Sequence, residues 1–225
     1  MVSARNLTKK FGDLTALSEI SLEIGSGEFV FLTGPSGAGK TTLFRLFLKE
    51  IEPSTGEIVI FDQNFAKITN KELTKLRRQI GIVFQDYRLL PEKNVWENIA
   101  LPLQFRNLPQ KDVDLAVKLS LDMVGLSDKG DLFPSQLSGG ELQRVSIARS
   151  IVGKPKLLMA DEPTGNLDPK TAKSIAKLLC DIHSELKTTI IMATHNSDIV
   201  NSHQYRVISL SGGKVVKDTP KGKYE

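Results

Sequence analysis

A glycine-rich loop with a strand before it and a helix after it constrains this chain more than any other feature. Residues 34–41 read Gly-Pro-Ser-Gly-Ala-Gly-Lys-Thr and match the pattern G-x-x-x-x-G-K-[ST]. An apolar run rich in β-forming residues, 28–33, precedes the loop, and residues 42–48 continue with helix-compatible spacing. A glycine-rich hairpin turn would explain the loop but not these flanks. The pattern therefore predicts strand, loop and helix in the order that a phosphate-binding loop requires.

The residue types of this loop indicate nucleotide binding. Glycine lets successive backbone N–H groups approach phosphate oxygens without a Cβ in the way. Lys40 supplies a positive charge for the outer phosphates, and the Thr41 hydroxyl suits magnesium. The helix expected to begin near Lys40 directs its positive end at the same anion. The residues expected at the nucleotide are Gly34, Pro35, Ser36, Gly37, Ala38, Gly39, Lys40, Thr41 and Thr42.

A second glycine-rich segment, Leu137-Ser-Gly-Gly-Glu141, lies about one hundred residues further along the chain. Ser138, Gly139 and Gly140 precede a predicted helix, so their backbone N–H groups form a second N-terminal site for an anion. One chain therefore offers two different phosphate-binding elements.

Polar side chains follow three apolar runs that we interpret as buried strands, 80–84, 157–160 and 190–193. Parallel strands deliver their last residues to the carboxyl edge of a sheet, where the phosphate loop also opens. Two acids before Pro163 could instead cap a turn, and a lone histidine is usually structural. We expect Asp161 to hold magnesium, Glu162 to act as general base or to orient water, His195 to contact the terminal phosphate, and Gln85 to reach magnesium and the water.

The composition is that of an ordinary soluble protein. Hydrophobic residues make up 40% of the 225 residues and charged residues 25%, and the formal net charge is +4. No aromatic residues are interleaved with the basic ones in a stacking pattern, so we expect no nucleic acid as partner. The apolar runs are too short for a membrane span, and the N-terminus lacks the apolar stretch of a secretory signal. Cys180 is the single cysteine, which excludes an internal disulfide, and we expect it to pack in a helix.

The order of the patterns predicts an α/β fold with a mostly parallel sheet. Two partly alternating segments, 2–11 and 14–24, joined by Gly12-Asp13, indicate an N-terminal antiparallel β region. Helical patterns replace strands between residues 86 and 155. We therefore expect a single domain over residues 1–225, in which residues 1–85 and 156–225 form the nucleotide-binding core and residues 86–155 form an inserted helical lobe.

Taken together, the motifs resemble those of the ATP-binding subunits of ABC transporters, and the resemblance covers nearly the whole chain. The features stand in the family's order: the loop at 34–41, Gln85, the signature 137–141, Asp161-Glu162, Asn166-Leu-Asp168 and His195. Phe11 matches the aromatic position that stacks on adenine, where tyrosine is more usual. The resemblance implies a P-loop NTPase core that hydrolyses ATP with Mg²⁺, and it adds Lys40, Gln85 and His195 to Glu162 as catalytic residues.

The resemblance also implies that two copies close head to tail on ATP. Each ATP would then lie between the phosphate loop of one copy and the signature of the other, so that a homodimer completes two sites. The residues reaching the partner copy's ATP would be Leu137, Ser138, Gly139, Gly140, Glu141 and Asp168.

Within the family, the segments 84–91 and 95–102 and the run Ala160-Asp-Glu-Pro-Thr-Gly-Asn-Leu-Asp168 are most similar to the bacterial cell-division ATP-binding proteins. That resemblance implies an integral membrane partner that contacts the region after Gln85, including Trp96, and a location on the cytoplasmic face of the inner membrane. Lipoprotein-releasing and macrolide-export ATPases share the same motif and stay open as alternatives, and a P-loop kinase is the more distant one. Leu142 after the signature and Asn196 after His195 depart from the usual pattern.

Overall fold

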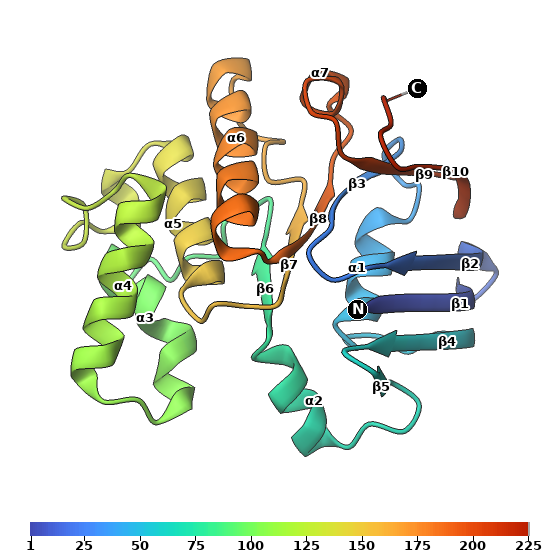
Figure 1. Cartoon of the computed structure of the whole chain (residues 1–225), viewed down its shortest axis with the longest axis horizontal. Helices are drawn as coiled ribbons and strands as arrows, with labels where there is room; N and C mark the ends of the chain where they lie inside the picture. The colour runs from blue at the N-terminus through green and yellow to red at the C-terminus, as the bar shows by residue number, and fades with distance from the viewer. Residues whose placement is uncertain (225) are drawn as a thin grey trace. The chain divides into compact units, whose positions relative to one another are not determined.

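The computed structural model describes residues 1–224, and the chain divides into two compact units (Figure 1). The first unit comprises Met1–Arg77 and the chain from Thr189 onward, and the second comprises Arg78–Thr188. Each unit contains one of the two glycine-rich segments.

The first unit contains an antiparallel sheet at the N-terminus, as predicted. Its strands are β1 (Val2–Phe11), β2 (Leu14–Ile24), β4 (Thr55–Ile60) and β5 (Gln63–Asn64), in the order β2-β1-β4-β5. All three pairings are antiparallel. Gly12 turns the chain between β1 and β2 with a φ of 57°, which glycine adopts without steric cost.

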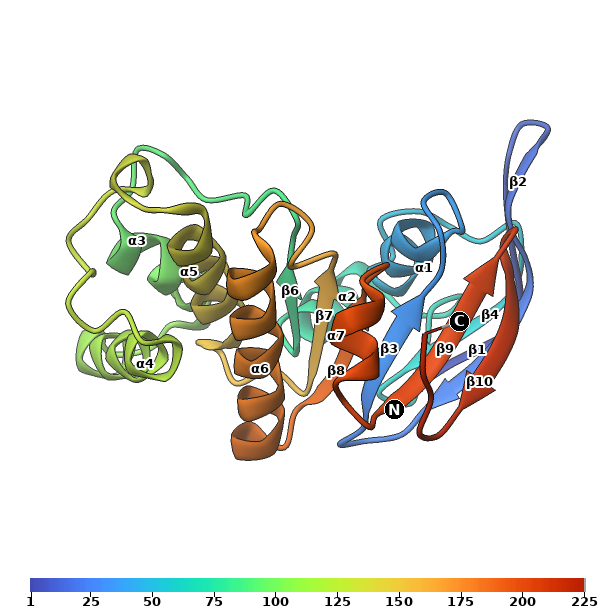
Figure 2. The same cartoon turned by 90° about the horizontal axis from the view of Figure 1, so that it is seen from above.

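A second set of strands in the first unit carries the phosphate loop. Strand β3 (Phe29–Thr33) is parallel to both β8 (Thr189–Ala193) and β9 (Arg206–Ser211), and β10 (Lys214–Thr219) is antiparallel to β9. Every residue of β3 and β8 is buried, which explains their continuous apolar sequences. Helices α1 (Lys40–Phe47), α2 (Asn70–Arg77) and α7 (Ser197–Asn201) complete the unit (Figure 2).

The second unit is mainly helical. It contains α3 (Val95–Ala100), η1 (Leu101–Arg106), α4 (Gln110–Val124), η2 (Pro134–Gln136), α5 (Gly139–Ile151) and α6 (Pro169–Leu186). Helix α5 packs against α3, α4 and α6, and also against β6 (Ile80–Val83). Strand β6 is parallel to β7 (Leu157–Asp161). The single cysteine, Cys180, is buried on α6.

The two compact units divide the chain at positions other than 85 and 156. Strands β6 and β7, which we expected in the nucleotide-binding core, belong to the unit that also holds the helices. The predicted division into core and helical lobe rests on the change from strand patterns to helical patterns along the chain, whereas the compact units rest on contacts between residues. The expected boundaries therefore stay a prediction.

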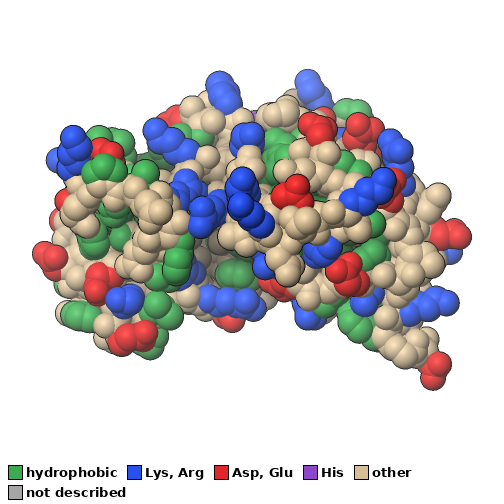
Figure 3. All heavy atoms as spheres, turned by 90° about the horizontal axis from the view of Figure 1, so that it is seen from below, with side chains coloured by type: hydrophobic (Ala, Val, Ile, Leu, Met, Phe, Trp, Pro, Cys, Tyr) green, Lys and Arg blue, Asp and Glu red, His purple; other side chains and the backbone are tan. Residues whose placement is uncertain are grey.

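The surface carries charges of both signs. On the face drawn in Figure 3, Lys and Arg side chains are interspersed with Asp and Glu side chains, in keeping with the modest net charge of +4. Among the described residues, no helix combines the length and the apolar character needed to cross a bilayer.

Close packing of β6 under α5 predicts that Gly81→Ala destabilises the protein. A Cβ added at Gly81 would lie 2.3 Å from the carbonyl oxygen of Ser150 and 2.9 Å from Leu158 Cδ1. Overpacking of this kind costs about 1–3 kcal/mol, which urea unfolding can measure. Gly130→Ala is the control, because the nearest atoms to its added Cβ are 3.7 and 3.9 Å away. Equal unfolding midpoints for the two variants would contradict this packing.

Candidate active site

The phosphate loop of the first unit leaves the buried strand β3 and enters α1. Gly34 has a φ of 143°, and a Cβ there would lie 2.2 Å from the carbonyl oxygen of Leu210. Gly39 caps α1 with a φ of 104°, and its Cβ would lie 2.5 Å from Leu17 Cδ2. Both positions therefore require glycine for two reasons, a backbone conformation that other residues rarely adopt and a lack of space.

The Lys40 side chain is hydrogen-bonded to the start of this loop. Its ammonium nitrogen donates to the carbonyl oxygens of Gly34, at 2.8 Å, and Pro35, at 3.2 Å. The residue is buried, at 7% exposure, so its charge is held against the loop rather than in solvent. As the first residue of α1, Lys40 also lies at the positive end of that helix. The loop, the lysine and the helix N-terminus thus form one anion-binding element.

The parallel pairing of the first unit brings His195 to the same edge as the phosphate loop. Leu32 of β3 pairs with Ala193 of β8, and the backbone N–H of Thr194 donates to the Leu32 carbonyl at 3.1 Å. Both strands therefore end side by side. His195 lies two residues after the end of β8 and is exposed. Its side chain is therefore accessible to a ligand.

Phe11 lies at the end of β1, beside the turn to β2. Its ring is 43% exposed, and the ammonium of Lys9 lies 4.9 Å from the ring centroid. An exposed aromatic ring at the tip of a hairpin is available to stack on a base.

The second unit brings Gln85, Asp161 and Glu162 to a common edge. Strands β6 and β7 are in register from Ile80–Leu157 to Val83–Ala160, so both run out at the same level. Gln85 follows β6 by two residues, Asp161 is the last residue of β7, and Glu162 comes next. Glu162 adopts a left-handed conformation, with a φ of 49°. Such backbone conformations in residues other than glycine are concentrated at functional sites.

An amide pair fixes Gln85 to the turn after Glu162. The Gln85 Nε2 donates to Asn166 Oδ1, and Asn166 Nδ2 donates to the backbone carbonyl of Gln85, both at 3.3 Å. The turn itself is closed by the Gly165 N–H, which donates to the Glu162 carbonyl at 3.0 Å. A Cβ at Gly165 would lie 2.9 Å from Gln85 Nε2, so the glycine makes room for the pair.

The donor set predicted for magnesium fits that ion. The Thr41 hydroxyl, the Gln85 amide oxygen and the Asp161 carboxylate are all hard oxygen ligands, which Mg²⁺ prefers. Three protein oxygens also suit an ion that usually retains waters and binds substrate phosphates.

The signature begins α5 as predicted. Ser138 is the N-cap, and its side chain forms a capping box with Glu141. The Ser138 hydroxyl donates to Glu141 Oε2 at 2.6 Å, and the Ser138 N–H donates to the same oxygen at 2.9 Å. These bonds, with the ammonium of Lys129 at 3.6 Å from Glu141 Oε1, hold the pKa of Glu141 below its usual value of 4.5.

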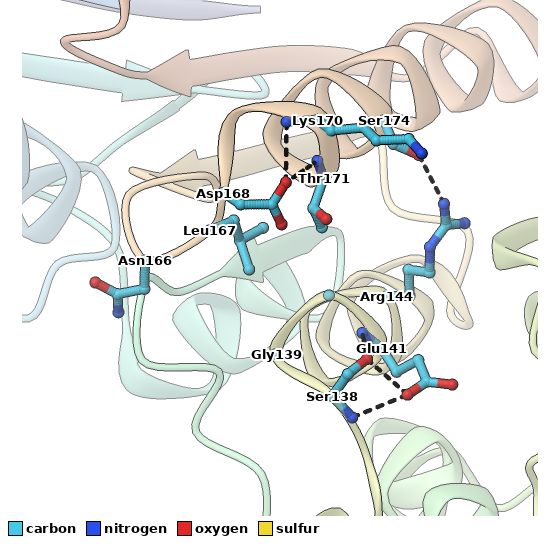
Figure 4. Close-up of a pocket in the computed structure, with 11 residues that line it drawn as sticks. Ser138, Gly139, Glu141, Arg144, Asn166, Leu167, Asp168, Lys170, Thr171 and Ser174 are labelled. Atoms are coloured by element: carbon cyan, nitrogen blue, oxygen red, sulfur yellow. Dashed lines mark hydrogen bonds between the residues drawn. The ribbon is translucent and has the colours of Figure 1, made fainter.

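A pocket of about 570 Å³ lies between the signature and the N-terminus of α6 (Figure 4). Asp168 caps α6 by accepting from the N–H groups of Lys170, at 3.0 Å, and Thr171, at 3.1 Å. The pocket is lined by Ser138, Gly139, Gly140, Glu141, Arg144, Asn166, Leu167, Asp168, Lys170, Thr171 and Ser174. The structure thus brings the predicted Ser138, Gly139, Gly140, Glu141 and Asp168 together, whereas Leu137 is not part of the lining.

Sequence reasoning missed the basic residues of this pocket. Arg144 donates to the Val124 carbonyl at 2.6 Å and to the Ser174 hydroxyl at 2.8 Å, which links α5 to α4 and α6. Gly140 allows the two helix N-termini to approach, because its Cβ would lie 2.7 Å from Thr171 Cγ2. The sequence pointed to these two pocket residues only through their spacing from the motifs. Arg144 is one helical turn beyond the signature, and Thr171 follows Asp168 by three residues.

Comparison with known proteins identifies the family. The family model described as ABC transporter matches residues 17–165, a segment that includes the phosphate loop, Gln85, the signature and the acidic pair. The chain belongs to the ABC transporter family of ATP-binding proteins. This family assignment excludes the P-loop kinase that the sequence motifs had left open.

Relatives and solved structures agree with this assignment. The chain is 46% identical to the cell division ATP-binding protein FtsE of Streptococcus pneumoniae, over all of this chain and 97% of that protein. It is 45% identical to FtsE of Bacillus subtilis, over 98% of that protein. The methionine import ATP-binding protein MetN 3 of Pectobacterium atrosepticum is 41% identical, with 65% of its length covered.

A solved dimeric ATP-binding cassette in a post-hydrolysis state with ADP and Pi is 35% identical, with a TM-score of 0.88 and complete coverage of both chains. The fold is therefore the predicted α/β P-loop ATPase fold, and this ABC protein binds ATP and hydrolyses it to ADP and phosphate.

The capping box predicts a defined pH dependence of stability. Because the pKa of Glu141 is lowered in the folded protein, the contribution of its carboxylate is present above the unfolded value of 4.5 and is lost as the pH falls through the lower folded value. We expect Glu141→Ala to lower the thermal midpoint by a constant amount above about pH 5.5, and by less below pH 4.5. Calorimetry at several pH values tests this. A difference that grows on acidification would contradict the sign.

Proposed function

We propose that this ABC ATPase is an FtsE-like subunit of a membrane complex in bacterial cell division. The observation that carries the proposal is the match to FtsE proteins at 45–46% identity over essentially their whole length, together with the full set of ATPase motif residues. In this role the ATP cycle acts on an FtsX-like integral membrane subunit that regulates cell-wall hydrolases. The protein would lie at the cytoplasmic face of the inner membrane, held there by that subunit.

Each predicted site residue has a separate role in this proposed reaction. Backbone N–H groups of residues 34–41 and the Lys40 ammonium bind the β- and γ-phosphates, where a positive charge stabilises the charge that develops in the transition state. Phe11 stacks on the adenine. Glu162 accepts a proton from, or orients, the water that attacks the γ-phosphate, and His195 contacts the departing phosphate. Thr41, Gln85 and Asp161 would hold Mg²⁺, which would supply positive charge to neutralise the phosphates.

The proposed active form is a homodimer. A second copy would place Ser138, Gly139 and Gly140 at the γ-phosphate, where the N-terminus of α5 offers N–H donors and a positive dipole end. Two observations support this. The pocket beside the signature is open in the single chain, and a solved neighbour with a TM-score of 0.88 is itself dimeric. Asp168, which lines the same pocket, would lie across the seam between the copies.

Glu162→Gln tests the base and the dimer together. The amide cannot take a proton, so we expect ATP turnover to fall by about 10²–10⁴-fold while ATP affinity stays within about 3-fold. Because ATP persists in the site, the variant should elute as a dimer with MgATP in size-exclusion chromatography. Hydrolysis at the parental rate would refute the assignment of Glu162.

A second substitution gives the matched control for the dimer. Ser138→Asp in the Glu162→Gln chain keeps a good N-cap for α5 but places a negative charge opposite the phosphate. We expect this double variant to bind ATP and remain monomeric. A stable MgATP dimer of the double variant would contradict the sandwich arrangement.

Trp96→Ala tests the predicted surface for the membrane subunit. Trp96 is partly buried on α3, and its backbone N–H, which the substitution keeps, donates to the Gly130 carbonyl at 2.9 Å. Since buried tryptophans dominate many interfaces, we expect co-purification with the FtsX-like subunit to weaken by at least about 10-fold, with ATP affinity unchanged. Phe105→Ala, at an aromatic residue 67% exposed in the same unit, is the control. Loss of ATP affinity with assembly intact would assign Trp96 to the core.

The identity of the co-purifying membrane protein also separates the alternatives. A lipoprotein-releasing or macrolide-export permease in place of an FtsX-like protein would overturn the cell-division role and leave the ATPase assignment standing.

A further inference from the structure

The two residues after Gln85-Asp86 have an unusual backbone. Tyr87 and Arg88 both lie in the left-handed region, with φ values of 59° and 48°. Neither is glycine, and residues with a Cβ seldom adopt this conformation, still less in succession. The rest of the structure must therefore hold the segment in place.

Arg149, near the C-terminal end of α5, holds both carbonyls of this segment. Its Nη2 donates to the Tyr87 carbonyl at 2.7 Å, and its Nη1 donates to the Arg88 carbonyl at 2.6 Å. Burial lowers the pKa of Arg149, since the guanidinium loses part of its hydration. Two short charge-assisted hydrogen bonds offset that loss. The planar guanidinium suits two neighbouring carbonyls, which a single ammonium would not bridge equally.

Further contacts fix the segment on either side of these bonds. On one side, Gln85 is tied to Asn166 by the reciprocal amide pair. At Tyr87, the side-chain hydroxyl lies 3.2 Å from where a Cβ of Gly139 would be, at the first residue of α5. Within the segment, the Arg88 guanidinium lies 3.9 Å from the centroid of the Phe84 ring. Residues 84–88 therefore connect the turn after Glu162 with both ends of the signature helix.

We propose that Arg149 is a positioning residue for ATP hydrolysis, which sets the place of Gln85 by holding the Tyr87 and Arg88 carbonyls against α5. The inference rests on the role proposed above for Gln85. The inference extends that role, because Arg149 belongs to the signature helix α5, and this helix would then help to position the Gln85 side chain. Movement of α5 when the signature binds a phosphate would then be transmitted to Gln85 through these two hydrogen bonds.

The test is a double-mutant cycle between Arg149→Met and Gln85→Ala in the full chain, with steady-state MgATP hydrolysis as the readout. Methionine has similar length and no donors. We expect Arg149→Met alone to lower kcat by about 10–100-fold and to change KM for MgATP by less than about 3-fold. In the Gln85→Ala chain it should change kcat by less than about 2-fold, because its effect acts through Gln85. Arg149→Lys, which keeps the charge and some donors, should be intermediate.

Arg106→Met is the matched control for lost stability. Arg106 lies in the same unit and also donates to two backbone carbonyls, of Gly153 at 2.9 Å and Arg78 at 2.6 Å, and burial likewise lowers its pKa. We expect Arg106→Met to lower the thermal midpoint as Arg149→Met does and to leave kcat within about 3-fold of parental. A kcat for Arg149→Met equal to that of Arg106→Met, or an equal loss in both Gln85 backgrounds, would overturn the proposal.

Amide hydrogen exchange separates this proposal from the role of Gln85 itself. Residues 85–90 should exchange faster in Arg149→Met than in Arg106→Met, because the carbonyl anchors are gone. Parental kcat for Gln85→Ala would contradict the role proposed for Gln85 whatever the exchange shows. Equal exchange in the two arginine variants would instead show that Arg149 does not hold the segment. If Arg149→Met does not fold, Arg149→Lys carries the same comparison.

Discussion

Parallel pairing of short, largely buried strands is the constraint on which the site depends. In a parallel sheet, neighbouring strands end at the same edge. The residues that follow these strands are therefore brought close together by the strand pairing alone. In the first unit, β3 and β8 end level with each other and release the phosphate loop and His195. In the second unit, β6 and β7 do the same for Gln85 and Asp161-Glu162. The apolar runs thus decide where the polar residues act.

The two phosphate-binding elements solve one physical problem with different local chemistry. Both use the N–H groups at the start of a helix, which have no partner within the helix. For α1, glycines with positive φ and the buried Lys40 surround the anion site. For α5, a serine caps the helix and its hydroxyl is bonded to Glu141. In the proposed dimer, the first arrangement would enclose the phosphates bound by its own chain, and the second would meet a phosphate bound by the other copy.

Hydrogen bonds between residues far apart in the sequence fix the positions of the side chains at these sheet edges. The Gln85–Asn166 pair spans 81 residues, and the Arg149 bonds to Tyr87 and Arg88 span 62 and 61. A similar contact stabilises the first unit, where Arg206 of β9 binds Asp218 of β10 and Glu28 before β3, contacts that raise the pKa of its guanidinium. Each arginine holds its own element against a segment that is distant in sequence. Local conformational preferences alone would not fix either segment in that position.

The sequence by itself determined the elements and the chemistry. The strand–loop–helix at 28–48, the start of a helix at the signature and the antiparallel hairpin of β1 and β2 were predicted with nearly correct bounds, because glycine and apolar periodicity act locally. Only the tertiary structure decided which groups Asn166, Arg144 and Arg149 contact. Their partners are 20 to 81 residues away and include backbone carbonyls, which every residue has and which no sequence pattern distinguishes.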